Sequence, residues 1–406
     1  RMPPAIVPAP ERLGPGPSPE AVACALGASG APGLSWLDGP GWGSSLLTAW
    51  PAEVLVSRPS DRDPLPALEA LCAAGGLVLL AAGYDLGGRM DRFPWPGKAR
   101  DDLGEPELEA ALYPGALLHD GEVWWVQGEP HAGLLKILGV AREPGEPAPA
   151  PKPRDLKRNF SPEGFRAAVA EARRLIFDGE IYQANLAQRF QVGTDEPPLA
   201  VYRRLRRTAR APYGAFLAWG GRAVLSASPE LFLEVKGRRV LTRPIKGTRP
   251  RGASPAEDAR LHAELEASAK DRAELAMIVD LERNDLGRLC TAGSVRVEVA
   301  RRITVFPGVH HAWAEVSGTL GPGKGLVDLL KAAFPGGSVT GCPRIRAMEV
   351  IDSLEPTRRG IYCGAVGRVL GGDACLNLAI RTMTVGKGLA TLHAGGGIVA
   401  DSEPEA

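Results

Sequence analysis

Several features that carry function in other proteins are missing from this sequence. Its six cysteines include no CxxC pair, and its six histidines form no cluster with the spacing of a metal finger, which argues against zinc-finger and CxxC redox proteins. The net charge is only +1 at pH 7, so bulk electrostatics favours neither nucleic acid nor membrane as a partner. No apolar run reaches membrane-spanning length and the N-terminal residues contain no apolar signal segment, so we expect a cytoplasmic protein with reduced thiols.

What is present indicates a globular protein of one large or two ordinary domains, with 406 residues, 44% hydrophobic and 23% charged. The proline-rich stretch EPGEPAPAPKP, residues 143–153, fits neither a helix nor a central strand. We therefore predict two regions, 1–150 and 151–406. The first, with short apolar segments between Gly/Pro turns, is predicted to be β-rich with a helix around PALEALCAAG.

Downstream, Ser161 and Pro162 have the character of an N-cap and a first helical residue, and the apolar spacing that follows predicts an amphipathic helix. IYQANLAQRF then alternates as a strand does. Two strands are predicted about the turn at Lys236, which places Glu230 and Lys246 near opposite ends of one hairpin, where twisting strands can bring both to one rim.

A longer helix is predicted over ASAKDRAELAMIVDLERNDLGRL, with Asp271 and Glu274 one turn apart near its start. Another helix, PRIRAMEVIDSLE, is followed by the segments IYCGAVGRVL, ACLNLAIRTMTV and LATLHAGGGIV, which predict a meander with glycine-rich turns.

Taken one at a time, the polar residues of these segments have ordinary explanations. Lys246, in LTRPIKGTRPRG, stands where lysines are usually solvated at the exit of a strand. Glu230 fits a turn glutamate in water, and carboxylates at a helix start are often stabilised by the macrodipole alone. The local pattern leaves these alternatives open.

The order of several motifs along the chain decides between these ordinary explanations and a functional one. EIYQANLAQRF, SASPELFLE, RPIKGTRPRG, AKDRAELAMIVDLERNDLGR, NLAIRT and AGGGIVADSEPEA follow one another from residue 160 onward. In this order they resemble the chorismate-utilising enzymes, and within them the synthase component I of aminodeoxychorismate synthases. AAGYDLGGR extends a weaker resemblance upstream. The resemblance implies an α+β fold, a four-layer α/β/β/α sandwich with two stacked, mostly antiparallel sheets wrapped by helices.

The resemblance also implies catalytic roles. Glu230 matches the general acid that protonates the departing C4 hydroxyl of chorismate. Lys246 matches the nucleophile that adds at C2 before ammonia adds at C4 and expels it, which gives 4-amino-4-deoxychorismate, a folate precursor. Glu274, with Asp271, matches the acidic pair that holds Mg²⁺.

Further residues match positions that contact the substrate in that family. Arg381 and Tyr362 match the groups that hold the enolpyruvyl carboxylate, and the backbone N–H of Gly395 completes that clamp. Gln183 stands where water-adding members carry a lysine base, so we predict that this chain does not add water. The remaining predicted contact residues are His311, Thr248, Thr340 and Gly341.

Ammonia is expected from a separate glutaminase subunit, because the chain has no glutaminase motif. The alternatives are anthranilate synthase component I, which carries alanine where this chain has Lys246, and a non-catalytic homologue. The second would be expected to lose Glu230, Lys246 or Glu274, and all three are present.

Overall fold

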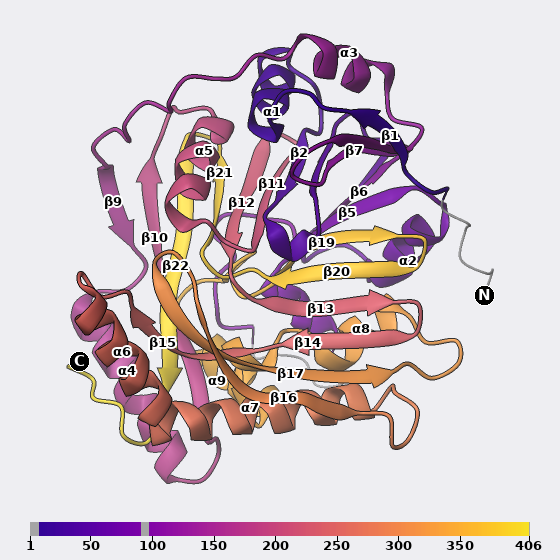
Figure 1. Ribbon diagram of the computed structural model, residues 1–406. Helices are drawn as coiled ribbons and strands as arrows, with labels where there is room; N and C mark the ends of the chain where they lie inside the picture. Colours follow the sequence, from indigo (N-terminus) through magenta and orange to yellow (C-terminus); the bar gives the residue numbers. More distant parts are fainter. Residues whose placement is uncertain (1–7, 91–96, 406) are drawn as a thin grey trace.

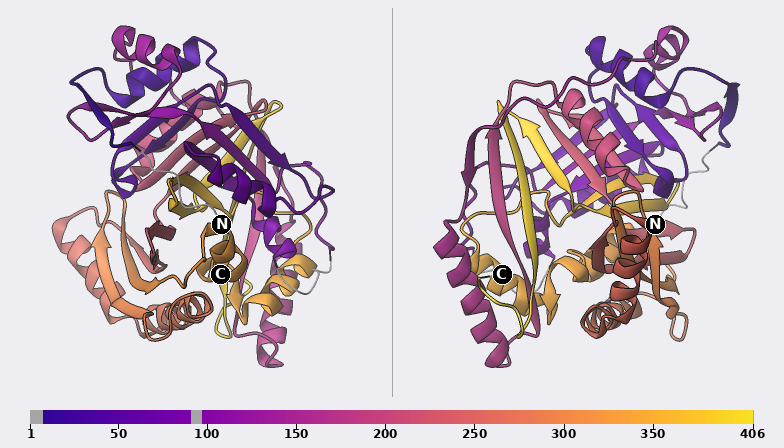
Figure 2. Two further views of the ribbon diagram at one scale, coloured as in Figure 1. Left: turned by 90° about the vertical axis from the view of Figure 1, so that its right-hand side faces the viewer. Right: turned by 60° about the vertical axis from the view of Figure 1, so that its left-hand side comes forward.

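The computed structural model describes residues 8–90 and 97–405. Two large, twisted sheets lie face to face, with helices on their outer sides (Figure 1, Figure 2). Every pairing between the assigned strands is antiparallel. This is the layered α+β architecture that the sequence resemblance implied.

The first sheet has twelve strands. In spatial order they are β1 (Glu11–Gly14), β8 (Trp124–Gly128), β7 (Gly115–His119), β3 (Ser45–Thr48), β2 (Ser35–Asp38), β11 (Tyr213–Trp219), β12 (Arg222–Ser228), β21 (Thr382–Gly386), β22 (Leu389–Ile398), β10 (Gln183–Gly193) and β18 (Gly341–Cys342), with β9 (Arg154–Arg158) also on β10.

The second sheet has ten strands. Their order is β15 (Ile245–Pro250), β17 (Val309–Thr319), β14 (Arg239–Arg243), β13 (Leu231–Lys236), β20 (Asp373–Leu378), β19 (Ala365–Leu370), β5 (Leu77–Ala82), β6 (Leu108–Tyr113) and β4 (Glu53–Ser57), with β16 (Arg296–Val305) also on β17. Strands from both sides of the proline-rich segment take part in each sheet.

The helices cover the outer faces and one end of the two sheets. The α-helices are α1 (Pro19–Ala28), α2 (Leu65–Ala73), α3 (Ala132–Val140), α4 (Pro162–Phe177), α5 (Pro198–Ala209), α6 (Pro255–Ala267), α7 (Ala269–Gly287), α8 (Leu326–Ala333) and α9 (Arg344–Leu354), and short 3₁₀ turns span Pro40–Trp42, Tyr84–Arg89 and Gly337–Val339. Helix α5 packs on β11 and β12, α7 on β15, β16 and β17, and α9 on β10. None of the described helices is both long and apolar enough to cross a membrane.

Three apolar clusters hold these layers together. One lies between the sheets and joins Leu37 and Leu46 of the first sheet to Leu77 and Leu79 of the second. A second cluster lies under α1, α3 and α5, and the third lies under α2, α4, α7, α8 and α9. Burial of these alternating strand residues and helix stripes is the main stabilising contribution to such a layered fold.

Most of the predicted elements are confirmed. Ser161 caps α4 by accepting a hydrogen bond from the Gly164 N–H, and Leu275, Ile278, Val279 and Leu286 form the buried stripe of α7. Helices α1, α3, α5, α6 and α8 were not predicted. Of these, α1 and α3 are short and apolar around most of their surface, which hides the helical period.

The predicted hairpin is confirmed, and the predicted meander is wrong. Glu230 precedes β13 and Lys246 follows β14. Because the two strands pair around Lys236–Arg239, both residues flank the open end of the hairpin, where Leu231 faces Arg243, and they lie at one rim as expected. The C-terminal strands are not one meander, because β19 and β20 belong to the second sheet while β21 and β22 belong to the first. The connection between β20 and β21 therefore crosses from one sheet to the other and brings Arg381 to their junction.

Candidate active site

A pocket of about 370 Å³ lies where the two sheets diverge, between β10 and β22 of the first sheet and β15 and β17 of the second. Seven of the residues predicted from the sequence line it together, although they come from segments more than 160 residues apart: Glu230, Lys246, Thr248, His311, Tyr362, Arg381 and Gly395. The crossing of the chain between the sheets makes this convergence possible.

Glu230 is a buried carboxyl group in the wall of this pocket, with 4% of its surface exposed. Burial raises its pKa to about 7, although hydrogen bonds from Ser338 and the Ile245 N–H and the charge of Lys246 oppose that shift. Ser338 Oγ donates to Glu230 Oε1 at 2.6 Å. The carboxyl group therefore keeps a proton close to neutral pH and is fixed in direction, as a general acid must be.

Lys246 projects into the same pocket from β15. Burial lowers the pKa of its amine, whereas the charges of Glu274 and Glu230 work in the opposite direction. No described carboxylate forms an ion pair with it. A lysine held in this way has a larger neutral fraction than a solvated one, which is the form that acts as a nucleophile.

A hydrogen-bonded row of three side chains forms one wall. Arg381 Nη2 donates to His311 Nε2 at 3.0 Å, and His311 Nδ1 lies 2.9 Å from Thr248 Oγ1. Burial and the adjacent guanidinium lower the pKa of His311 to about 4, so the imidazole is neutral and accepts from Arg381. The charge of Arg381 is thus not neutralised by its neighbour and stays available for a carboxylate.

The backbone around this wall is unusual. Arg381 has φ of 49° and Cys363, next to Tyr362, has φ of 63°, in the left-handed region that residues other than glycine rarely use. Such conformations concentrate at ligand-binding sites, where surrounding structure enforces them. Tyr362 stacks on His393, with ring centroids 5.2 Å apart and planes at 10°.

Gly395 belongs to β22 opposite Ala187 of β10. A Cβ atom at this position would lie 2.2 Å from the Leu186 carbonyl oxygen, so only glycine fits. Thr340 and Gly341 lie behind the wall: Thr340 Oγ1 donates to the Gly336 carbonyl at 3.1 Å, and Gly341 pairs with Ala184. Their predicted contact with substrate stays a prediction.

Gln183 lies at the start of β10 and is fully buried. Two lining residues that the sequence analysis did not select are Asn185, also on β10, and His393, on β22. Asn185 stands two positions after Gln183, and strand alternation places both on one face. This two-residue spacing is the sequence feature that could have pointed to Asn185. No feature of the sequence pointed to His393.

The predicted metal ligands, Asp271 and Glu274, lie on α7, next to Lys246 of β15. Asp271 Oδ2 pairs with Arg249 at 3.2 Å, whereas the Glu274 carboxylate is close enough to Lys246 to be the largest charge acting on its pKa. Within 8–90 and 97–405, no group of three or more His, Cys, Asp or Glu side chains is arranged to hold a metal. One or two carboxylates with water are nevertheless a usual donor set for Mg²⁺, so these residues fit that ion.

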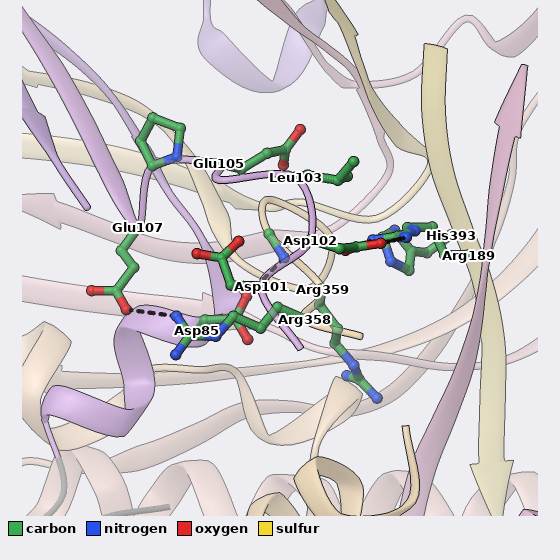
Figure 3. Close-up of a pocket in the computed structure, with 12 residues that line it drawn as sticks. Asp85, Asp101, Asp102, Leu103, Glu105, Glu107, Arg189, Arg358, Arg359 and His393 are labelled. Atoms are coloured by element: carbon green, nitrogen blue, oxygen red, sulfur yellow. Dashed lines mark hydrogen bonds and ion pairs between the residues drawn. The ribbon is translucent and has the colours of Figure 1, made fainter. Parts of the chain in front are cut away.

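A second, smaller polar pocket adjoins the first and shares His393 with it. Figure 3 shows acidic side chains of residues 101–107 facing the arginines that project from the other side. Arg189 binds Asp102 through two hydrogen bonds, and Glu107 pairs with Arg89 and Arg358. Its charges are largely matched within the protein.

Comparisons with known proteins agree with this geometry. The profile of the family described as chorismate binding enzyme matches residues 49–406. Aminodeoxychorismate synthase component 1 of Klebsiella aerogenes is 40% identical over 84% of this chain and 75% of that protein. Anthranilate synthase component 1 of Streptomyces coelicolor is 46% identical, over 67% of this chain and 55% of that protein.

Among solved structures, anthranilate synthase component I from Streptococcus pneumoniae TIGR4 superposes with a TM-score of 0.78 at 30% identity, covering 89% of both chains. The match in sequence extends over both regions of the chain, and the match in structure extends over both sheets. This chain belongs to the family of chorismate binding enzymes.

Proposed function

We propose that this chain is the synthase component of an aminodeoxychorismate synthase, which converts chorismate and ammonia to 4-amino-4-deoxychorismate. The similarity to several aminodeoxychorismate synthase components 1, each about 40% identical over most of this chain, supports the proposal. The observation that carries it is the pair formed by a buried lysine amine, with a lowered pKa, and a buried carboxyl group, with a raised pKa, in one pocket.

The two groups suit a covalent substitution in two steps. The neutral Lys246 amine adds at C2 while Glu230 gives its proton to the C4 hydroxyl, which leaves as water. Ammonia then adds at C4, the ring double bonds shift back, and the lysine leaves. Dividing the substitution in this way replaces one difficult step by two easier ones, and Glu230 is present to recover a proton from the incoming nitrogen.

The pocket wall formed by Arg381, His311 and Thr248 suits the carboxylates of the substrate. Arg381 offers a guanidinium that forms no ion pair with the residues the structure describes, and the neutral His311 fixes its direction. Tyr362 and the Gly395 backbone lie beside it in the pocket. We infer that the enolpyruvyl carboxylate binds to this group, since a guanidinium donates two parallel hydrogen bonds to a carboxylate.

Mg²⁺ is inferred to bind through Glu274 with Asp271 beside it. When bound, it would neutralise the ring carboxylate of chorismate. Within the chain, Arg249 holds Asp271 in place, which leaves Glu274 as the carboxylate that is free to take the ion.

Anthranilate synthase component I is the second candidate, because several of the similar proteins carry that name. Lys246 argues against it, since an enzyme in which ammonia attacks C2 directly has no use for an amine there. Ammonia in the cell is inferred to come from a separate glutaminase subunit, which the designation of the relatives as component 1 supports.

The test is to identify the product formed from chorismate, Mg²⁺ and ammonium chloride by liquid chromatography and mass spectrometry. Aminodeoxychorismate is the expected product. Anthranilate would assign the chain to the other branch, and isochorismate would contradict the interpretation of Gln183.

A further inference from the structure

Two carboxamide side chains on one face of β10 carry buried polar atoms that have no hydrogen-bond partner within residues 8–90 and 97–405. Gln183 is 0% exposed and Asn185 is 6% exposed. Neither polar atom of the Gln183 amide, nor Asn185 Nδ2, has a partner among the described residues. An unpaired buried amide group costs on the order of 1–3 kcal/mol, so two in succession on one strand indicate a binding site rather than a defect in packing.

The opposite strand carries a glycine at this place. Gly397 of β22 faces Asn185, and a Cβ atom on Gly397 would lie 2.7 Å from Gln183 Nε2 and 3.6 Å from Lys246 Nζ. The amide of Gln183 and the amine of Lys246 therefore approach the same point, and a side chain at position 397 would collide with the amide. Glycine here makes room for the unpaired Gln183 amide beside Lys246.

Asn185 lies in the same pocket as the general acid, Glu230. It lines the pocket together with Glu230 and Lys246, and its backbone N–H donates to the Thr340 carbonyl at 2.8 Å. Ser338, two residues before Thr340, donates to Glu230. The Asn185 carboxamide thus belongs to the same pocket wall region as the two groups that act on the substrate.

The carboxamides of Asn185 and Gln183 favour a small, neutral ligand. A carboxamide offers both donors and an acceptor but takes up no proton at neutral pH. Ammonia, which also donates and accepts, needs no base in order to attack, whereas water does. The substrate's carboxylates have a better partner in Arg381 on the other wall.

We propose that Asn185, flanked by Gln183, binds the ammonia nucleophile between Lys246 and Glu230. This inference rests on the proposed function. In the second step the bond from nitrogen to C4 forms, the bond from Lys246 to C2 breaks, and Lys246 leaves as a neutral amine. One proton of the new C4 ammonium passes to the Glu230 carboxylate, which restores the acid.

The test compares Asn185→Leu with wild type, using the whole chain, chorismate and ammonium chloride. We expect the KM for ammonium to rise at least about tenfold, as the loss of one hydrogen bond to a bound ligand predicts, while the KM for chorismate changes less than twofold. With chorismate alone, intact-mass spectrometry is expected to find as much lysine adduct as in wild type. Gln191→Leu is the matched control, because Gln191 is a carboxamide on the same face of β10 but outside the pocket.

A rise in the KM for chorismate, or loss of the adduct, would overturn the inference, because Asn185 would then act on the substrate or on the fold. If Asn185→Leu lowers the thermal midpoint, Asn185→Ala provides the same comparison with less steric change. Failure of the proposed function gives a different result: wild type itself would form no aminodeoxychorismate. If wild type forms anthranilate, ammonia is still the nucleophile, and the KM comparison still decides the role of Asn185.

Discussion

The two polar pockets that meet at His393 differ in how their charges are satisfied. In the smaller one, Arg189 is paired with Asp102, and Arg358 is paired with Glu107 (Figure 3). Glu107 also pairs with Arg89, which lies outside the pocket lining. In the larger one, neither Lys246 nor Arg381 forms an ion pair with any carboxylate in the described part of the chain, and Glu230 is kept protonated by burial.

This difference distinguishes charged side chains that stabilise the fold from those that are available for a ligand or a reaction. Ion pairs whose partners are both present join segment 101–107 to Arg189 of the first sheet and to Arg358, so these charges are already matched within the protein. Unpaired groups in a pocket carry a cost in stability that a ligand or a reaction offsets. We therefore expect substitutions in the two pockets to act on different quantities.

The largest effect is expected for Lys246→Ala. Loss of the only amine in the described pocket removes the nucleophile, so aminodeoxychorismate formation should fall by a factor of about 10³ or more. Product analysis by liquid chromatography measures this, with the thermal midpoint as the control for folding. Retention of the product within tenfold would contradict a covalent role.

Glu230→Gln should reduce kcat by a factor of about 10² to 10⁴, the usual range for a general acid. Its pKa, raised to about 7, keeps the carboxyl group protonated below that pH. The wild-type rate should therefore fall about tenfold per pH unit above 7. The variant should lack this decline, and a basic limb that persists in Glu230→Gln would have to belong to another group.

Arg381→Lys tests the anion-binding wall. A lysine keeps the charge but loses the two parallel hydrogen bonds, so the KM for chorismate should rise about 10- to 100-fold. The KM for ammonium should be unchanged. Equal changes in both constants would mean that the substitution disturbs the whole pocket instead of one carboxylate contact.

Arg189→Met is expected to have the smallest effect on activity. It leaves Asp102 without its partner, so the free energy of unfolding should decrease by about 1–3 kcal/mol in chemical denaturation. Both KM values should stay within twofold of wild type. A selective loss of ammonium binding would instead give the smaller pocket a part in the reaction.

Much of the fold and of the site was predictable, for different reasons. The apolar stripe of α7 and the cap at Ser161 depend on local spacing, which the sequence contains directly. The convergence of Lys246, Arg381 and Tyr362 came from the order of motifs rather than from local pattern. That Glu230 and Lys246 share one rim was expected from strand twist, and the register of β13 and β14 places both at the open end of the hairpin.

Asn185 and His393 were missed because their importance depends on neighbours that are distant in sequence. Asn185 is unusual because glycine faces it on β22 and no acceptor in the described part of the chain reaches its Nδ2. His393 is placed by its stacking on Tyr362. Neither property can be inferred before the pairing of β10 with β22 is known.

The central claim is that Lys246 forms a covalent bond with the substrate. The most direct test is to incubate the protein with chorismate and Mg²⁺ without ammonia, then to map the modified peptide by mass spectrometry. The account predicts a mass increase of chorismate less one water on Lys246, which disappears when ammonium is added. An unmodified Lys246 in protein that still forms aminodeoxychorismate with ammonium would contradict it.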